Sequence, residues 1–408
     1  MSTKAASLTA VMRIPAFRTL WTAQVVSIFG DFLALFGVIS LITFRLHGTP
    51  ADVALATVAY LAPVSAVAPV AGVLVDRWRV KRVMIASDLL RAAIAASLVL
   101  VHDVGQICLI MALLGLVSSF FGPAQSVALR TLVPKEDLLA ANAMLSQAFY
   151  IVRIAAPALA GPLVAWLTER ACFWLDAGSF VFSAAMIGRL AIVQAAAPAR
   201  EGSLRALGRE FAEGNRFIFT HRGLSFAFLG SAAAMFMLSS FSPLVSVYVR
   251  DMLGAGTIMY GAISAAVGVG LILGTTVVQR AAKDRPMANV VIIGLLLLGV
   301  GAALLGAFKN SGTAALSTLT IGVAIAIVIV PAQTLSQKET PPAMMGRVSS
   351  TFMSLFSLAQ VLGMLLSGVL ATQLGIRQLF LGCGAALGVL AAAGWTWLRP
   401  RPQAEPAS

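Results

Sequence analysis

Two ionisable side chains lie deep inside long apolar stretches of this chain. Counting 1.5 Å per helical residue, Asp31 falls about 20 Å into a stretch that begins at Phe17, and Arg153 falls about 22 Å into one that begins at Leu138. An isolated charge in lipid is costly, so opposite charges at similar depth are expected to pair. We expect Asp31 to carry a proton and Arg153 to restrain it. A static ion pair that fixes helix packing is the alternative.

Polar uncharged side chains form a second candidate site within the apolar stretches. In lipid such groups face a cavity or a neighbouring helix, so they predict either a substrate-binding lining or hydrogen bonds between helices. Two of them are the last residue of the tripeptide Pro-Ala-Gln, which occurs once in each half of the chain. The candidate substrate-binding residues are Gln24, Gln125, Gln147, Tyr150, Gln333 and Gln360.

Long apolar helices must position these side chains. The chain has 408 residues, of which 59% are hydrophobic and 11% charged, whereas a soluble domain carries about 25% charged residues. The stretches are too long and too uniformly apolar for barrel strands. We predict an all-α membrane protein with twelve transmembrane helices, each near the length that crosses a bilayer. The predicted spans are Phe17–Phe44, Ala51–Val75, Val83–Val101, Val104–Leu129, Leu138–Leu167, Ala171–Val193, Leu224–Val249, Thr257–Ala281, Met287–Phe308, Gly312–Leu335, Val348–Leu374 and Leu379–Leu398.

The basic residues indicate topology and not a nucleic-acid surface. The net charge is +13, but Lys and Arg are spread over short loops and concentrate in every second loop. Cytoplasmic loops of membrane proteins carry this excess of Lys and Arg. We therefore expect a multi-pass protein of a bacterial-type cytoplasmic (inner) membrane, with both termini in the cytoplasm and no nucleic-acid partner.

An internal repeat divides the chain into two halves. Pro123-Ala124-Gln125 recurs as Pro331-Ala332-Gln333, and Asp76-Arg77 recurs as Asp284-Arg285, both at the same offset. Parallel repeats of this kind are typical of transporters and predict two pseudo-symmetric six-helix bundles. The predicted parts are a first bundle (1–193), a cytoplasmic linker (194–223), a second bundle (224–399) and a cytoplasmic tail (400–408). Leu204, Leu207, Phe211 and Ile218 recur at helical spacing and predict an amphipathic helix in the linker.

Enzymatic, metal and cofactor sites are not expected. The chain lacks the Gly-x-x-x-x-Gly-Lys-Ser/Thr loop that binds nucleotide phosphates. Its three cysteines, Cys108, Cys172 and Cys383, lack the spacing of metal or redox motifs. No acid, base and nucleophile gather in one place. We therefore expect neither an enzyme nor a bound cofactor.

One loop resembles the signature of a known family. The segment Gly72-Val73-Leu74-Val75-Asp76-Arg77-Trp78-Arg79-Val80-Lys81-Arg82 is similar to the Gly-x-Leu-x-Asp-Arg-x-x-x-Arg/Lys-Lys/Arg loop of the major facilitator superfamily. The resemblance extends over almost the whole chain. It is closest to the branch that holds macrolide efflux proteins and enterobactin-type siderophore exporters. The residues that carry this second likeness are Phe17-Arg18-Thr19-Leu20-Trp21, Gly30-Asp31, Asp88-Leu89-Leu90-Arg91, Glu213-Gly214-Asn215-Arg216-Phe217-Ile218 and Pro342-Ala343-Met344-Met345-Gly346-Arg347.

The resemblance implies a cytoplasmic gate. Asp76 would meet helix ends of the other half near Arg347, with Arg130 close by, and Asp284 and Arg285 would be the weaker counterpart. The remaining gating residues implied by the loop are Gly72, Arg77, Lys81 and Arg82. Exporters of the family often carry Gly-Pro-x-x-Gly-Gly in the fifth span. This chain has Ala156-Pro157-Ala158-Leu159-Ala160-Gly161 there, which keeps a small surface for close helix packing.

These features together predict a secondary active transporter. We expect proton-coupled efflux of a small amphipathic molecule, a drug or a siderophore, by alternating access, with protons and membrane lipid as the other partners and a monomer as the working unit. One alternative is a lysophospholipid or other lipid transporter on the same scaffold. A second alternative is a gradient-independent channel or a transport-like receptor.

Overall fold

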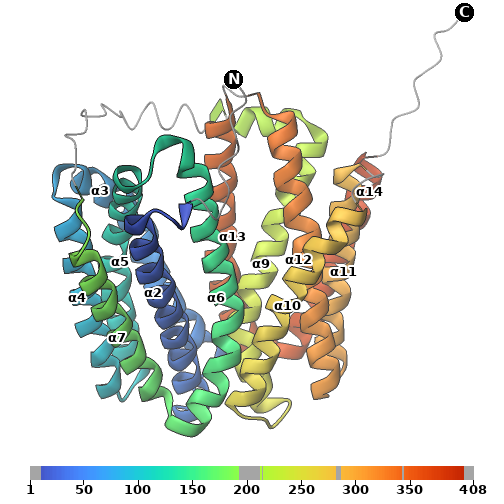
Figure 1. Cartoon of the computed structure of the whole chain (residues 1–408). Coiled ribbons are helices and arrows are strands. Elements are labelled where there is room, and N and C mark those ends of the chain that lie inside the picture. Colours follow the sequence, from blue (N-terminus) through green and yellow to red (C-terminus); the bar gives the residue numbers. More distant parts are fainter. Residues whose placement is uncertain (1–10, 193–211, 214, 282–285, 342–343, 399–408) are drawn as a thin grey trace, which may run out of the picture. The chain divides into compact units, whose positions relative to one another are not determined.

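The chain folds into membrane-length helices (Figure 1). The computed structural model describes residues 11–192, 212–213, 215–281, 286–341 and 344–398, and these ranges contain helices and connecting turns but no strand. Twelve of the helices are long and apolar enough to cross a membrane. The predicted all-α membrane fold with twelve spans is therefore confirmed, and each predicted span overlaps one of the observed helices.

Contacts divide the chain into two compact units, which are described separately. The first unit comprises residues 1–200 together with Val245–Ala265. Its membrane-length helices are α2 (Pro15–Ser40), which continues into the π-helical turn η1 (Leu41–Arg45), α3 (Pro50–Arg77), α4 (Val80–Ser97), α5 (Val104–Leu132), α6 (Leu138–Leu167) and α7 (Glu169–Gly188). The short 3-10 turns η2 (Leu98–Leu100) and η3 (Lys135–Asp137) follow α4 and precede α6.

Small residues let the helices of the first unit approach closely. Helix α7 packs against both α2 and α4, and α5 packs against both α3 and α4. At the crossing of α3 and α5, a Cβ added to Gly115 would lie only 2.1 Å from the carbonyl oxygen of Tyr60. Interfaces between membrane helices favour such small residues because they bring the backbones together. This packing fixes which faces of α2, α4, α5 and α7 meet.

The second unit comprises residues 201–244 and 266–408. Its helices are α9 (Arg222–Asp251) and α10 (Thr257–Ala281), each shared with the first unit, and α11 (Met287–Ala307), α12 (Ser311–Glu339), α13 (Met345–Leu374) and α14 (Ile376–Leu398). Helix α11 packs against α12 and α14. Gly270 and Gly274 of α10 have the Gly-x-x-x-Gly spacing that favours close packing of membrane helices. A Cβ on Gly270 or Gly274 would lie 2.2 or 2.6 Å from atoms of α12, so the two helices pack closely there.

A second Gly-x-x-x-Gly pair behaves differently from the expectation of close packing. A Cβ on Gly384 would lie 2.8 Å from the carbonyl oxygen of Gly299 on α11, so Gly384 sits at a tight crossing. A Cβ on Gly388 would meet nothing within 4 Å. Residues four apart lie on one face of a helix, and a Cβ on Gly299 of α11 would lie 3.0 Å from the carbonyl oxygen of Gly384 and 3.7 Å from the backbone nitrogen of Gly388, so the crossing is tightest at Gly384.

The linker prediction rests mainly on residues outside the described ranges. Leu204, Leu207 and Phe211 of the predicted amphipathic helix lie there, as do the predicted boundaries at 193, 194, 399 and 400. Ile218 is described, and it is buried in a cluster with Leu224 of α9. The two-bundle division with its linker and tail stays a prediction.

Candidate proton-coupling site

The close crossing of α2 and α7 brings two acidic side chains together. Gly30 on α2 has no side chain, and a Cβ there would lie 2.3 Å from Ser179 Oγ and 2.7 Å from Asp176 Oδ1, both on α7. The carboxyl group of Asp176 therefore lies against the backbone of the residue that precedes Asp31. Asp176 is 2% exposed, and Asp31 is half-buried. The helix crossing thus places two carboxyl groups within electrostatic range of each other.

Helix α4 contributes an arginine and a third acidic side chain. Asp88 and Arg91 form an ion pair one helical turn apart, and both are buried. The guanidinium group of Arg91 stands between two aromatic rings, with its Cζ atom 4.4 Å from the ring centre of Phe121 and 4.3 Å from that of Phe180. Flat stacking on aromatic faces favours arginine over lysine. Asp88 and Arg91 therefore pair along one face of α4, as residues three apart on a helix can, and the rings hold the guanidinium group in place.

Arg91 is also a basic neighbour of the two other acidic residues, Asp31 and Asp176. It interacts electrostatically with Asp31 and with Asp176, and Asp31 further interacts with Asp88. We call Asp31, Asp88, Arg91 and Asp176 the acidic cluster. It holds three carboxyl groups and one guanidinium group, drawn from α2, α4 and α7.

The acidic cluster leaves several polar atoms without hydrogen bonds. Among the described residues, Asp88 Oδ2, Arg91 Nε and Asp176 Oδ1 are buried and have no hydrogen-bond partner. Buried polar groups are normally paired, and an unpaired one is expensive in an apolar setting. A site with surplus acid and free acceptor atoms can bind a proton or a cation, and this is the chemistry that the cluster offers.

Asp31 has a basic neighbour in addition to the predicted partner Arg153. We expected Arg153, which is half-buried on α6, a helix that packs against α2. The structure shows Arg91 as a basic neighbour of Asp31. Pairing of Asp31 with Arg153 stays a prediction.

The predicted substrate-binding residues are placed in varied surroundings. Gln24 is 5% exposed, and its Nε2 atom has no hydrogen-bond partner within the described ranges. Gln125 and Gln360 are half-buried, and Gln147 and Gln333 are exposed on the protein surface. The side chain of Tyr150 lies outside the described part. The binding role of all six residues stays a prediction.

The predicted gating residues of the signature loop and its surroundings are only partly described. Lys81 donates a hydrogen bond of 2.7 Å from Nζ to the carbonyl oxygen of Gly188, which ties the start of α4 to the end of α7. Arg347 forms an ion pair with Glu213. Gly72 is half-buried, and Arg77, Arg82 and Arg130 are exposed. The side chain of Asp76, and Asp284 and Arg285 as a whole, lie outside the described residues.

Two members of the acidic cluster escaped the sequence reasoning. Asp176 lies inside a predicted span, a signal that could have flagged it, yet only Asp31 and Arg153 were taken as deeply placed charges. The spacing of Arg91 from Asp88 indicates an ion pair within α4 but not the approach of Arg91 to Asp31 and Asp176. The sequence gives no sign of the close crossing at Gly30, where α7 packs against α2.

Comparison with known proteins places the chain in a family. Residues 20–363 match the sequence model of the Major Facilitator Superfamily, which is most of the chain. The chain belongs to the major facilitator superfamily. It is therefore a multi-pass membrane transporter, in agreement with its twelve membrane-length helices. The resemblance of the Gly72–Arg82 loop predicted this family correctly.

Relatives within the superfamily are similar over nearly their full length. The MFS-type transporter YfiS of Bacillus subtilis (strain 168) is 30% identical over 393 residues, which cover 92% of this chain and 93% of that protein. Macrolide efflux protein A of Streptococcus pyogenes is 22% identical over 382 residues, which cover 91% of this chain and 93% of that protein. A solved structure of a bacterial homolog to the human lysosomal transporter Spinster shares the fold, with a TM-score of 0.73 at 13% identity and coverage of 95% and 99%.

Proposed function

We propose that this superfamily member is a proton-coupled exporter of a small amphipathic molecule, a drug or a siderophore, and not an enzyme. It works by alternating access, as a monomer, in a bacterial cytoplasmic membrane with both termini in the cytoplasm. The acidic cluster supports proton coupling most directly, because a buried surplus of carboxyl groups needs a cation for neutrality. Similarity to macrolide efflux protein A supports outward transport.

Asp31 is the proposed proton carrier. It is half-buried, whereas Asp88 and Asp176 are buried, so it is the cluster member that a proton or cargo reaches most readily. A proton on Asp31 would remove one of the surplus negative charges beside Arg91. Arg153 stays the proposed second restraint on Asp31. One elementary charge that crosses 100 mV supplies about 2.3 kcal/mol, which supports a roughly fifty-fold gradient of a neutral cargo.

Cargo binding and gating follow from the other predicted residues. Gln24, Gln125, Gln147, Tyr150, Gln333 and Gln360 are the proposed polar contacts for cargo. The loop from Gly72 to Arg82, with Arg130 and Arg347, is the proposed cytoplasmic gate, and Asp284 and Arg285 are its counterpart. Buried Gln24 with its unbonded amide nitrogen is the best placed of the glutamines to donate a hydrogen bond to a cargo oxygen.

An accumulation and susceptibility panel tests this function. Cells that lack their main efflux pumps should express the intact chain or the Asp31→Asn variant, and the panel should include erythromycin, ethidium and a catechol siderophore. We expect the intact chain to lower accumulation of at least one compound and an uncoupler to restore it. Export that persists at full rate with the uncoupler would contradict proton coupling and would favour a gradient-independent channel.

Lipid transport is the second candidate, and one cavity favours it. The second unit has a partly open pocket of about 360 Å³ between α9, α13 and α14, which is lined almost wholly by apolar side chains. Among them are Phe236, Met237, Leu362, Cys383 and Leu390. Such a cavity fits an acyl chain but offers nothing to a polar headgroup. Accelerated export of a labelled lysophospholipid, with unchanged drug accumulation, would support this candidate over drug efflux.

A further inference from the structure

Two helices are each divided between the compact units. Helix α9 belongs to the second unit up to Leu244, but its last turns and the start of α10 belong to the first unit as Val245–Ala265. Helix α9 itself runs without interruption from Arg222 to Asp251. Any movement of the second unit as a body must therefore bend these helices or release the contacts of Val245–Ala265.

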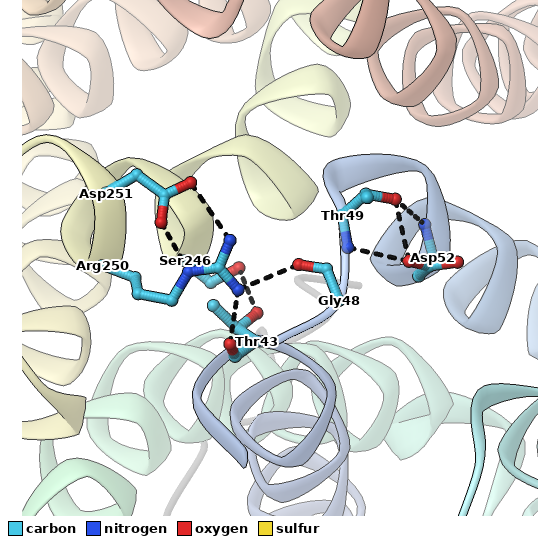
Figure 2. A network of polar contacts seen from close by, with 7 residues as sticks. All are labelled: Thr43, Gly48, Thr49, Asp52, Ser246, Arg250 and Asp251. Carbon is cyan, nitrogen blue, oxygen red and sulfur yellow. Dashed lines mark hydrogen bonds and ion pairs between the residues drawn. The ribbon is translucent and has the colours of Figure 1, made fainter. Parts of the chain in front are cut away.

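Arg250 joins this segment to the turn η1 and to Gly48 just after it (Figure 2). Its Nη1 atom donates to the carbonyl oxygens of Thr43 at 2.6 Å and of Gly48 at 2.9 Å. Beside it, the hydroxyl groups of Thr43 and Ser246 form a buried hydrogen bond of 3.0 Å. We call these four residues, Thr43, Gly48, Ser246 and Arg250, the Arg250 clasp.

The local structure after α2 presents the carbonyl groups that Arg250 binds. The last carbonyl groups of a helix have no partner within it. Here α2 ends in the π-helical turn η1, and His47 adopts a left-handed conformation with φ of 54°. The backbone N–H of Gly48 turns back to the carbonyl oxygen of Ile42 at 2.8 Å, and a Cβ on Gly48 would lie 2.6 Å from the Ile42 side chain. The turn is thus tight and leaves the carbonyl oxygens of Thr43 and Gly48 for the guanidinium group.

Arg250 also forms an ion pair with Asp251, its neighbour in the chain. Its Nε and Nη2 atoms bind the carboxylate of Asp251 at 2.6 and 3.0 Å. Because Asp251 is the next residue on α9, this ion pair can persist when the carbonyl contacts break.

Tyr260 and Gly261, both on α10, make further contacts with α2 and α6. The ring of Tyr260 stacks on Phe36 of α2 with ring centres 4.5 Å apart. A Cβ on Gly261 would lie 2.6 Å from the carbonyl oxygen of Pro157 on α6, which confirms the predicted close packing at Ala156–Gly161. The clasp is therefore accompanied by a close-packed contact of α10 with α2 and α6.

We propose that the Arg250 clasp is a gate on the membrane side opposite the Gly72–Arg82 loop, and that it must open once in each transport cycle. The inference rests on the proposed alternating access. Helix α3 begins at Pro50, directly after the clasp, and reaches Arg77 only after 28 residues, which is enough to cross a bilayer. The clasp and the signature loop therefore mark opposite ends of the same helix.

A reversible crosslink tests whether the clasp opens. The hydroxyl oxygens of Thr43 and Ser246 are 3.0 Å apart, so cysteines at both positions can form a disulfide after a small rotation. The double variant Thr43→Cys/Ser246→Cys should be made after alanine replaces the three native cysteines. We expect oxidation to reduce export of ethidium or erythromycin at least tenfold and a reductant to restore it. Undiminished export by fully oxidised protein would overturn the proposal.

A labelling experiment reports opening without any cargo or proton gradient. Ser40 is fully buried just before η1, so Ser40→Cys in the same cysteine-free chain should react slowly with a membrane-impermeant thiol reagent in right-side-out vesicles. We expect Arg250→Ala to speed this reaction several-fold. Equal rates with and without Arg250 would overturn the clasp as a gate, whether or not the protein is proton-coupled.

Arg377 provides a matched control for the labelling. It also donates to two backbone carbonyl oxygens, those of Gly306 at 2.6 Å and Ala307 at 3.1 Å, and all three residues lie in the second unit. Arg377→Ala removes the same kind of contact without touching the clasp. We expect it to leave Ser40→Cys labelling unchanged. Acceleration equal to that of Arg250→Ala would show general loosening and would contradict a specific gate.

Discussion

Replacement of Asp31 with Asn should abolish uphill export and leave downhill exchange of cargo intact. Asparagine keeps the size and polarity of the side chain but cannot take up or release a proton. Ethidium is a cation, so its exchange for one proton moves no net charge and is driven by the pH gradient. In inverted vesicles energised by respiration, we expect the intact chain to accumulate ethidium about tenfold for each pH unit of the gradient, and we expect Asp31→Asn to lower this ratio to about one. Fluorescence quenching of ethidium in these vesicles measures the ratio.

Asp137, which lies outside the acidic cluster, supplies the control for the Asp31 variant. Asp137 lies in the turn η3, and its side chain caps no helix. Asp137→Asn therefore makes the same chemical change away from the acidic cluster, and we expect it to keep uphill export. The carrier role of Asp31 would be wrong if Asp31→Asn built the same gradient as Asp137→Asn with unchanged pH dependence.

Replacement of Arg91 with Leu should have the largest effect on folding. The guanidinium group is 5% exposed, and its partner Asp88 is wholly buried. Removal of one member of a buried ion pair leaves an uncompensated charge, which destabilises a protein by about 3–5 kcal/mol. We expect a sharply reduced yield of folded protein, measured by size-exclusion chromatography in detergent, and a lower thermal midpoint in the same detergent.

A charge-neutral double variant separates the loss of charge balance from the loss of packing. In Asp88→Leu/Arg91→Leu both buried charges disappear, and apolar side chains often replace such pairs without loss of stability. We expect this variant to recover most of the folded yield that Arg91→Leu loses. A single Arg91→Leu variant as stable as the unchanged protein would refute the buried electrostatic account of the cluster.

The twelve spans were predictable because hydropathy and length alone define them. Leu138–Leu167 and Thr257–Ala281 have the same bounds in the sequence prediction and in the structure. The sixth span was predicted to reach Val193, but α7 ends at Gly188. Apolar residues continue past the helix end there, so hydropathy gave no signal for its termination.

The sequence could indicate the Asp88–Arg91 pair of the acidic cluster but not the approach of Asp176 to Asp31. Asp88 and Arg91 are three residues apart on one helix, and such local spacing is visible in any sequence. The approach of Asp176 to Asp31 depends on which face of α7 meets α2. A single glycine, Gly30, permits that approach, and hydropathy does not distinguish a glycine at a tight crossing from one that faces open space.

The Arg250 clasp could not be read from the sequence. Arg250 binds carbonyl oxygens of Thr43 and Gly48, about two hundred residues away in the chain. Every residue carries such a carbonyl group, so no residue type marks the acceptors. The π-helical turn that presents them has no sequence signature of its own.

Direct measurement of proton movement tests the role of the acidic cluster. Purified protein in liposomes with a trapped pH-sensitive dye should receive an outward gradient of ethidium or erythromycin, with valinomycin and potassium to clamp the voltage. We predict that cargo efflux drives protons inward in the intact protein, and that Asp31→Asn exchanges cargo without any dye response. Equal proton movement by Asp31→Asn, or cargo-driven flux by the intact protein with no proton movement, would contradict the account.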